Sequence, residues 1–117
     1  MNRPPALAAH ETQILAETFR LLGDPTRLRI LLHCLAGPCP VGEIAEGLDL
    51  SQSLVSHHLR LLRAARLVRG ERRARQVFYA LADRHVSDML ADMASHVAEE
   101  RGDGRTASGA GAAGASR

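Results

Sequence analysis

The sequence predicts a mainly α-helical protein with one β-hairpin, in the order helix, helix, helix, helix, hairpin, helix. Apolar residues recur at helical spacing in five segments that Gly, Pro and Asp separate. Residues 67–81 are instead rich in β-branched and aromatic side chains on both sides of a charged turn. The 117 residues suffice for one hydrophobic core, and their 45% hydrophobic and 24% charged content excludes disordered, collagen-like and disulfide-framework classes.

The first two helices are marked by their apolar stripes and by the residues between them. The stripe of the first helix consists of Ile14, Leu15, Thr18, Phe19 and Leu22. Gly23 ends this helix, and Asp24 followed by Pro25 begins the next, as an N-cap with proline in the first helical position. The buried face expected for the second helix consists of Leu28, Leu31, Leu32 and Leu35. Gly37 and Pro38 end it.

The remaining elements follow in the same way. A short third helix is expected over 41–48, and Ser51 caps a fourth over 52–66. The hairpin occupies 67–81, and the last helix runs from Asp83 to about Arg101. The sequence therefore predicts a flexible leader (1–10), one folded domain (11–101) and a disordered Gly- and Ala-rich tail (102–117).

Charge and cysteine content restrict the partners and the location. The net charge of +2 hides seven arginines against one acid in residues 51–80, a pattern that favours a polyanion. No apolar stretch approaches the roughly 20 residues of a membrane helix, and no signal segment begins the chain. The two cysteines, Cys34 and Cys39, are too close in sequence to staple a fold. We therefore expect a cytoplasmic protein without a membrane partner or a small organic substrate.

The third and fourth helices have the dimensions of a helix-turn-helix. The expected packing stripe of the fourth helix consists of Leu54, Val55, Leu59 and Leu62. A second stripe carries hydrogen-bonding groups suited to bases and phosphates, and Gln52 beside it has an amide suited to adenine. The predicted DNA-binding residues are Gln52, Ser53, Ser56, His57 and Arg60 on the helix and Arg72, Arg73 and Arg75 on the hairpin. The fold class is thus a winged helix-turn-helix that binds double-stranded DNA.

Two segments resemble the ArsR/SmtB family of bacterial metal-sensing repressors. The run 50–59, LSQSLVSHHL, is similar to the family's recognition helix, and 22–28, LGDPTRL, is similar to its first helix junction. The resemblance covers about Thr12 to Glu100. It implies a homodimer that binds an imperfect palindrome and leaves it when metal binds.

The last helix carries a candidate metal site composed of Asp83, His85, His96 and Glu99. Two imidazoles and two carboxylates suit Zn²⁺, with Ni²⁺ and Co²⁺ next. His85 and His96 share a helix face but lie about 16 Å apart, so one helix cannot close the site. An antiparallel pair of helices from two subunits brings the four together, and this spacing also resembles the zinc site of the SmtB-like branch. Asp88 and Asp92 lie on the same face and are alternative ligands.

Four other interpretations stay open. One is a thiol- or redox-responsive regulator that uses Cys34 and Cys39. Family members of the arsenic and cadmium type carry a Cys-x-Cys motif where this chain has Pro40 and Gly42, so a soft-metal site fits poorly. Another is a hydrolytic metal site. Four protein ligands would leave the metal no open position for water or substrate, so we expect that the protein is not an enzyme. The others are a metal-buffering protein and a metal-independent DNA-binding protein. His10 is a further candidate ligand.

Overall fold

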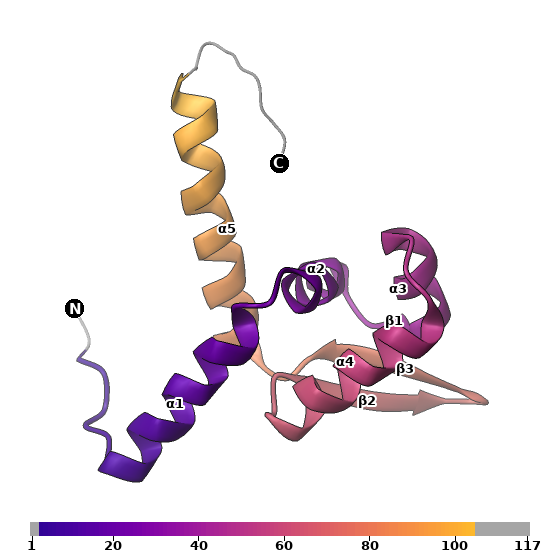
Figure 1. The fold of residues 1–117 in the computed structure, drawn as a ribbon, viewed down its shortest axis with the longest axis horizontal. Coiled ribbons are helices and arrows are strands. Elements are labelled where there is room, and N and C mark those ends of the chain that lie inside the picture. Colours follow the sequence, from indigo (N-terminus) through magenta and orange to yellow (C-terminus); the bar gives the residue numbers. More distant parts are fainter. Residues whose placement is uncertain (1–2, 105–117) are drawn as a thin grey trace. The chain divides into compact units, whose positions relative to one another are not determined.

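The computed structural model describes residues 3–104, which form two compact units divided after Leu81 (Figure 1). The first unit contains α1 (Ala9–Leu22), α2 (Pro25–His33), the short 3-10 helix η1 (Cys34–Ala36), β1 (Cys39–Pro40), α3 (Val41–Leu48), α4 (Gln52–Ala64), β2 (Val68–Arg73) and β3 (Gln76–Leu81). The second unit is the helix α5 (Arg84–Gly104). This order confirms the predicted winged helix-turn-helix, to which η1 and β1 are additions.

Local hydrogen bonds explain where the helices begin. The Asp24 carboxylate accepts from the Arg27 backbone N–H at 3.0 Å and caps α2, as expected, with Pro25 in the first helical position. The Ser51 hydroxyl accepts from the Leu54 N–H at 3.1 Å and caps α4. α1 begins two residues before the expected boundary at residue 11, because the Glu11 carboxylate accepts from the Ala8 N–H at 2.9 Å.

The turn of the helix-turn-helix and the end of α4 both use left-handed backbone. Asp49 has a φ of 58° and ends α3, as its short polar side chain allows. α4 ends at Ala64, two residues earlier than expected, and Arg66 follows with a φ of 62°. This residue redirects the chain into β2.

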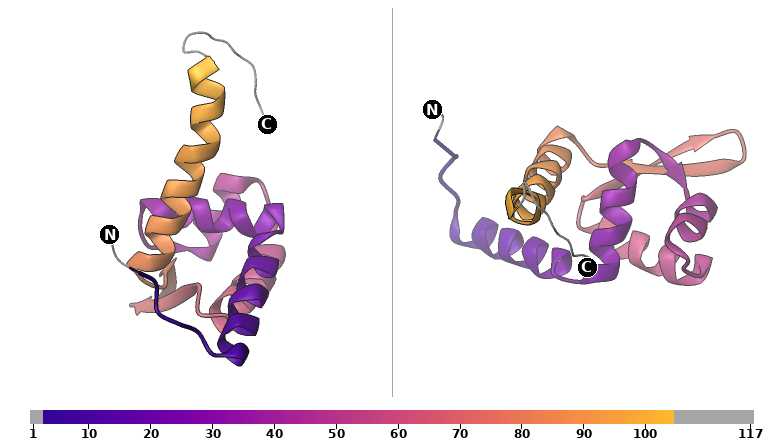
Figure 2. Two further views of the ribbon diagram at one scale, coloured as in Figure 1. Left: turned by 90° about the vertical axis from the view of Figure 1, so that its left-hand side faces the viewer. Right: turned by 90° about the horizontal axis from the view of Figure 1, so that it is seen from above.

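The wing is a three-stranded antiparallel sheet in the order β1-β3-β2. β2 and β3 form the expected hairpin, with Arg73 opposite Gln76 beside the turn. The two-residue strand β1, which the sequence did not predict, pairs Cys39 with Tyr79. The β2–β3 ribbon extends beyond the helices of the first unit (Figures 1 and 2).

The core of the first unit lies where α2, α3 and α4 meet the sheet. Its fully buried side chains are Ile30, Leu31, Ile44, Val55, Leu59 and Leu62. Two expected core residues, Leu32 and Leu54, are instead each 39% exposed. α2 buries positions 30 and 31, which leaves Leu32 on another side of the helix. α4 buries positions 55, 58, 59 and 62, which excludes Leu54.

The apolar stripe of α1 faces solvent in the single chain. Ile14 is 62% exposed and Phe19 is 56% exposed, whereas Leu21 and Leu22 at the end of the helix are buried. Helical spacing identified these residues as one face. No other described element of the first unit buries that face.

α5 begins where the sequence predicted and continues further. The Asp83 carboxylate accepts from the Val86 N–H at 3.1 Å, so Asp83 is the N-cap. The helix runs to Gly104, three residues beyond the expected end, and the rest of the expected tail, 105–117, lies outside the described residues. None of the helices within residues 3–104 has the length and apolar character needed to span a membrane.

Candidate functional site

α4 presents the predicted polar face to solvent. Ser53, His57 and Arg60 are exposed, and Ser56 is half-buried at the edge of that face. The Ser51 cap fixes the first turn, and the buried side of the helix holds it against the core. The exposed side is therefore a rigid row of hydrogen-bonding groups of the kind that contacts DNA.

A polar hollow of about 410 Å³ separates α4 from the wing. Gln52 and Ser56 line it from α4 and Arg75 lines it from the hairpin, so three predicted DNA-binding residues share one depression. Gly42 also lines the hollow, and a Cβ added there would be in ordinary van der Waals contact, at 3.4 Å, with the Gln52 amide nitrogen. None of the described residues that line the hollow is acidic, which suits a phosphodiester backbone.

The sequence missed two other polar residues of this hollow, Gln76 and Tyr79. Both belong to β3, and Tyr79 pairs with Cys39 of β1. Their position in the hollow depends on how the hairpin packs relative to α4, which residue spacing in the sequence does not predict. Alternation along 76–81 gave no signal either, because residues three apart point to opposite sides of a strand.

The three wing arginines differ in their surroundings. Arg73 donates to the Glu71 carboxylate at 3.0 Å, and its guanidinium carbon lies 4.7 Å from the centre of the Phe78 ring. Hydrogen bonds from Arg69 and Arg73 lower the pKa of Glu71. Within residues 3–104, Arg72 and Arg75 make no hydrogen bond or ion pair. They are the wing cations that remain available for phosphate.

The adjacent histidines of α4 have opposite environments. His57 is exposed, whereas His58 is buried with 8% of its surface accessible, and Arg27 of α2 donates from Nε to its Nδ1 at 3.2 Å. Burial, followed by the nearby Arg27 charge, lowers the pKa of His58. The neutral imidazole therefore acts as a hydrogen-bond acceptor that ties the recognition helix to α2, a role that the sequence did not indicate.

α5 carries the four predicted metal ligands on its surface. His85 Nδ1 lies 3.7 Å from Asp83 Oδ1 at the start of the helix, and both side chains are more than half exposed. His96 and Glu99 are exposed three turns further along. Within one chain, residues 3–104 bring no three His, Cys, Asp or Glu side chains together in a metal-binding group. The structure thus brings together Asp83 and His85 but does not join them to His96 and Glu99.

The alternative aspartates of α5 have different partners. Asp88 Oδ2 lies 3.8 Å from Arg84 Nε in an exposed ion pair one turn apart. Asp92 is exposed on the same side as His85 and His96. An exposed pair of this kind contributes little to stability, so Asp88 remains accessible to a ligand.

Both cysteines are free thiols with raised pKa values. Burial, with a smaller contribution from Cys39, raises the pKa of Cys34 to about 11. Burial also raises the pKa of Cys39, and so does the Glu43 carboxylate, which lies 3.8 Å from its sulfur. Thiolates are the reactive and metal-binding form, so neither cysteine is activated at neutral pH.

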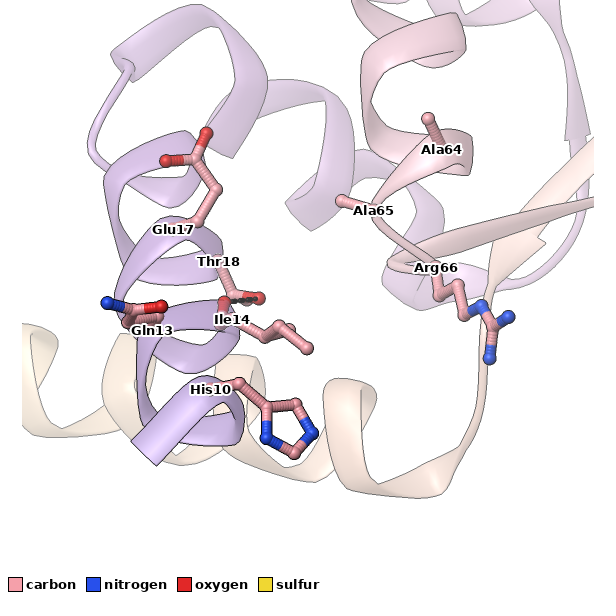
Figure 3. A pocket seen from close by; sticks show the side chains of 8 residues that line it. All are labelled: His10, Gln13, Ile14, Glu17, Thr18, Ala64, Ala65 and Arg66. Atoms are coloured by element: carbon pink, nitrogen blue, oxygen red, sulfur yellow. Dashed lines mark hydrogen bonds between the residues drawn. The ribbon is translucent and has the colours of Figure 1, made fainter. Parts of the chain in front are cut away.

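A groove of about 720 Å³ lies between α1 and the end of α4 (Figure 3). Ile14, Ala64 and Ala65 provide its apolar surface, and His10 and Arg66 lie on opposite sides of it. His10 is therefore on the first unit, on the surface that also carries the exposed stripe of α1.

Comparisons with known proteins agree with this geometry. A family model described as "Bacterial regulatory protein, arsR family" matches residues 24–69, from the cap of α2 into β2. The "Transcriptional repressor SmtB homolog" of Synechocystis is 38% identical over 97 residues, which are 83% of this chain and 74% of that protein. The "HTH-type transcriptional regulator NmtR" of Mycobacterium tuberculosis is 42% identical over 96 residues, 81% of this chain and 80% of its own. The solution structure of the "cadmium metal-sensor CMTR" from Mycobacterium tuberculosis superposes with a TM-score of 0.62 at 45% identity and covers 70% of this chain and 85% of its own.

Proposed function

Because this chain belongs to the arsR family of bacterial regulatory proteins, we propose that it is a metal-responsive transcriptional repressor that works as a homodimer. The family is one of transcriptional regulators, and the chain is not an enzyme. In our proposal the metal-free dimer binds a palindromic operator in the cytoplasm, and binding of Zn²⁺, or of Ni²⁺ or Co²⁺, releases it. The exposed polar face of α4 and the free wing cations Arg72 and Arg75 support the DNA-binding part.

The observation that carries the metal-binding part is the arrangement of donors on α5. Asp83 and His85 are adjacent at one end, and His96 and Glu99 are exposed on the same side of the helix further along. The two histidines are eleven residues apart, close to three full turns, and thus about 16 Å apart along the axis. A tetrahedral ion with ligand distances of about 2 Å needs all its donors within a few ångström of one another. The pair Asp83 and His85 and the pair His96 and Glu99 therefore each need further donors from another chain.

An antiparallel pair of α5 helices supplies them. Pairing His85 with the partner's His96 places the twofold axis near Leu90 and Ala91, and pairing Asp83 with the partner's Glu99 places it at the same point within half a residue. Two independent pairs that agree on one axis support two identical sites, each with Asp83 and His85 from one subunit and His96 and Glu99 from the other. A closed interface of this type is the commonest in homodimers.

The donors present fit such an ion. The Asp83 cap uses Oδ1, so Oδ2 of the same carboxylate is available for ligation. The imidazoles of His85 and His96 are exposed, so they can bind a metal ion without first leaving a buried position. Two nitrogens and two oxygens match the borderline preference of Zn²⁺, which when bound would link two α5 helices across the dimer. The exposed apolar stripe of α1 is a further surface that a second subunit could cover.

A thiol-responsive regulator is the second candidate, and the structure favours it less. Cys34 is buried and the pKa values of both thiols are raised, whereas a reactive sensor cysteine needs a lowered one. Replacement of Cys34 and Cys39 should therefore leave the metal response intact.

Mixed dimers test the shared site. A subunit with His85→Ala, paired with one carrying His96→Ala, keeps one complete site if ligands come from both chains, because the first still offers His96 and the second still offers His85. If each site formed within one chain, both would be damaged. We therefore expect one tight Zn²⁺ site per mixed dimer by calorimetric titration, against two for the wild type.

The matched control places both substitutions in one subunit and pairs it with a wild-type partner. A shared site then predicts no tight site, whereas a site within one chain predicts one. One tight site in the first mixed dimer and none in the control would support the proposal. No tight site in the first and one in the control would disprove it. Operator binding by fluorescence anisotropy provides the functional readout, because His96→Ala should abolish release by Zn²⁺ and leave metal-free binding unchanged.

A further inference from the structure

We propose that Leu54 reads a thymine in the operator, through van der Waals contact between its side chain and the C5 methyl group. This inference rests on the proposed DNA-binding role of α4. It adds an apolar specificity contact to a face on which the sequence indicated only polar ones.

The position of Leu54 in α4 separates it from the core. Leu54 and Val55 are consecutive in the sequence and about 100° apart around the helix. Val55 is fully buried, whereas Leu54 is 39% exposed. The other buried residues of α4 are His58, Leu59 and Leu62, so Leu54 lies outside the buried side of the helix. Leu54 is the one exposed large hydrophobic residue of α4 in the described chain.

Leu54 also lies in the part of α4 that meets base edges. It belongs to the first turn, and the N-terminal residues of a recognition helix contact the floor of the major groove. Its backbone N–H donates to the Ser51 hydroxyl at 3.1 Å, which fixes the Cα–Cβ direction. His57, the neighbour one turn further along, is exposed, so the side chain points toward a surface that solvent reaches.

The chemistry of the groove identifies the partner base. Donors and acceptors of A, G and C edges have nothing to offer an isobutyl side chain, whereas the thymine methyl group is the apolar feature of the major groove. Gln52 and Leu54 are about 200° apart around the helix, and Gln52 lines the hollow beside the wing. The two residues therefore contact different base pairs, with Leu54 on the side of α4 away from the wing.

The experiment uses the full-length wild-type protein to select binding sites from a random duplex library. The selected site should contain a thymine at one position of each half-site whose replacement by deoxyuridine, which removes only the methyl group, weakens binding. Burial of one methyl group corresponds to about fourfold in affinity, or about 15-fold for a symmetrical pair of half-sites. With Leu54→Ala, the same replacement should change affinity less than about twofold, and a new selection should lose the thymine preference.

Leu32→Ala is the matched control, because Leu32 of α2 is also 39% exposed. This variant should select the wild-type sequence and keep the full deoxyuridine penalty. Retention of that penalty in Leu54→Ala would overturn the inference, as would dissociation of the Leu54→Ala protein into monomers, which would assign the leucine to a subunit contact. Failure of the wild-type protein to select any sequence would instead overturn the proposed function, and the inference with it.

Discussion

Replacement of both Arg72 and Arg75 with alanine in each subunit should flatten the salt dependence of DNA binding, whereas replacement of Arg73 alone should change it little. The three residues are neighbours on the hairpin and looked equivalent in the sequence. In the structure, Arg73 is held by Glu71 at 3.0 Å and lies over the Phe78 ring. Arg72 and Arg75 have no hydrogen-bonded or ionic partner within the described part of the chain, so they are free to reach phosphates.

The size of the effect follows from counterion release. Each phosphate contact contributes about 0.9 to the slope of log K against log salt concentration. Two free arginines on each of two wings make four contacts per homodimer, so the double variant should have a slope smaller by about 3.6. Between about 0.05 and 0.2 M salt, the wild type should lose about 150-fold more affinity than the variant.

Fluorescence anisotropy with a duplex that lacks an operator measures this slope, because phosphate contacts do not depend on sequence. Arg73→Ala is the control within the same wing, and circular dichroism checks that each variant folds. A double variant with the wild-type slope would refute the contact of the wing with DNA. If Arg73→Ala lowered the slope by as much as each substitution in the double variant does, Arg73 would contact phosphate as well. That result would refute the distinction between Arg73, which pairs with Glu71, and the two arginines without a partner among the described residues.

Three further predictions concern stability and reactivity. Iodoacetamide at about pH 8 should label Cys34 only after denaturation, since its pKa is raised to about 11, and mass spectrometry of native and urea-treated protein checks this. Burial lowers the pKa of His58, so the unfolded chain binds a proton at this residue more readily than the folded chain does. The free energy of unfolding is therefore unaffected by this residue above its ordinary pKa of 6.5, and it decreases as the pH falls below that value. Thermal unfolding at about pH 7.5 and 5.5 should accordingly show a smaller difference for His58→Gln than for the wild type or for His57→Gln. In urea unfolding, Leu62→Ala should cost about 2–5 kcal/mol because the side chain is fully buried, and Leu54→Ala should cost less than about 1 kcal/mol; equal costs would contradict the assigned faces of α4.

The sequence was sufficient for elements whose boundaries are chemical. α3 has the predicted bounds because Pro40 disfavours helical backbone in the residue before it and Asp49 takes the left-handed conformation after the helix. The cap formed by Asp24 was predictable for the same reason, since both partners lie within one turn. Such local determinants need no knowledge of the rest of the fold.

Features that depend on distant contacts were not predictable. His58 becomes a core residue because Arg27, 31 positions earlier, provides its hydrogen bond. Strand β1 is too short to show a period, and only its pairing with β3 defines it. In the candidate site, the sequence indicated the α4 face and the ligand types of α5, but it could not show that Arg73 pairs with Glu71, because either charge could equally have faced solvent.

The pairing of Cys39 with Tyr79 has a mechanical consequence for the whole regulator. It fastens the beginning of α3 to the middle of the wing, while α4 packs against both α3 and β2, so the elements that meet DNA cannot change their spacing independently. In the proposed homodimer, the remaining variable is the distance between two such blocks along the double helix, where one turn spans about 34 Å. A shift of a few ångström at the dimer interface would then leave the DNA-binding elements of each subunit unchanged. It would still decide whether both subunits fit successive grooves at once.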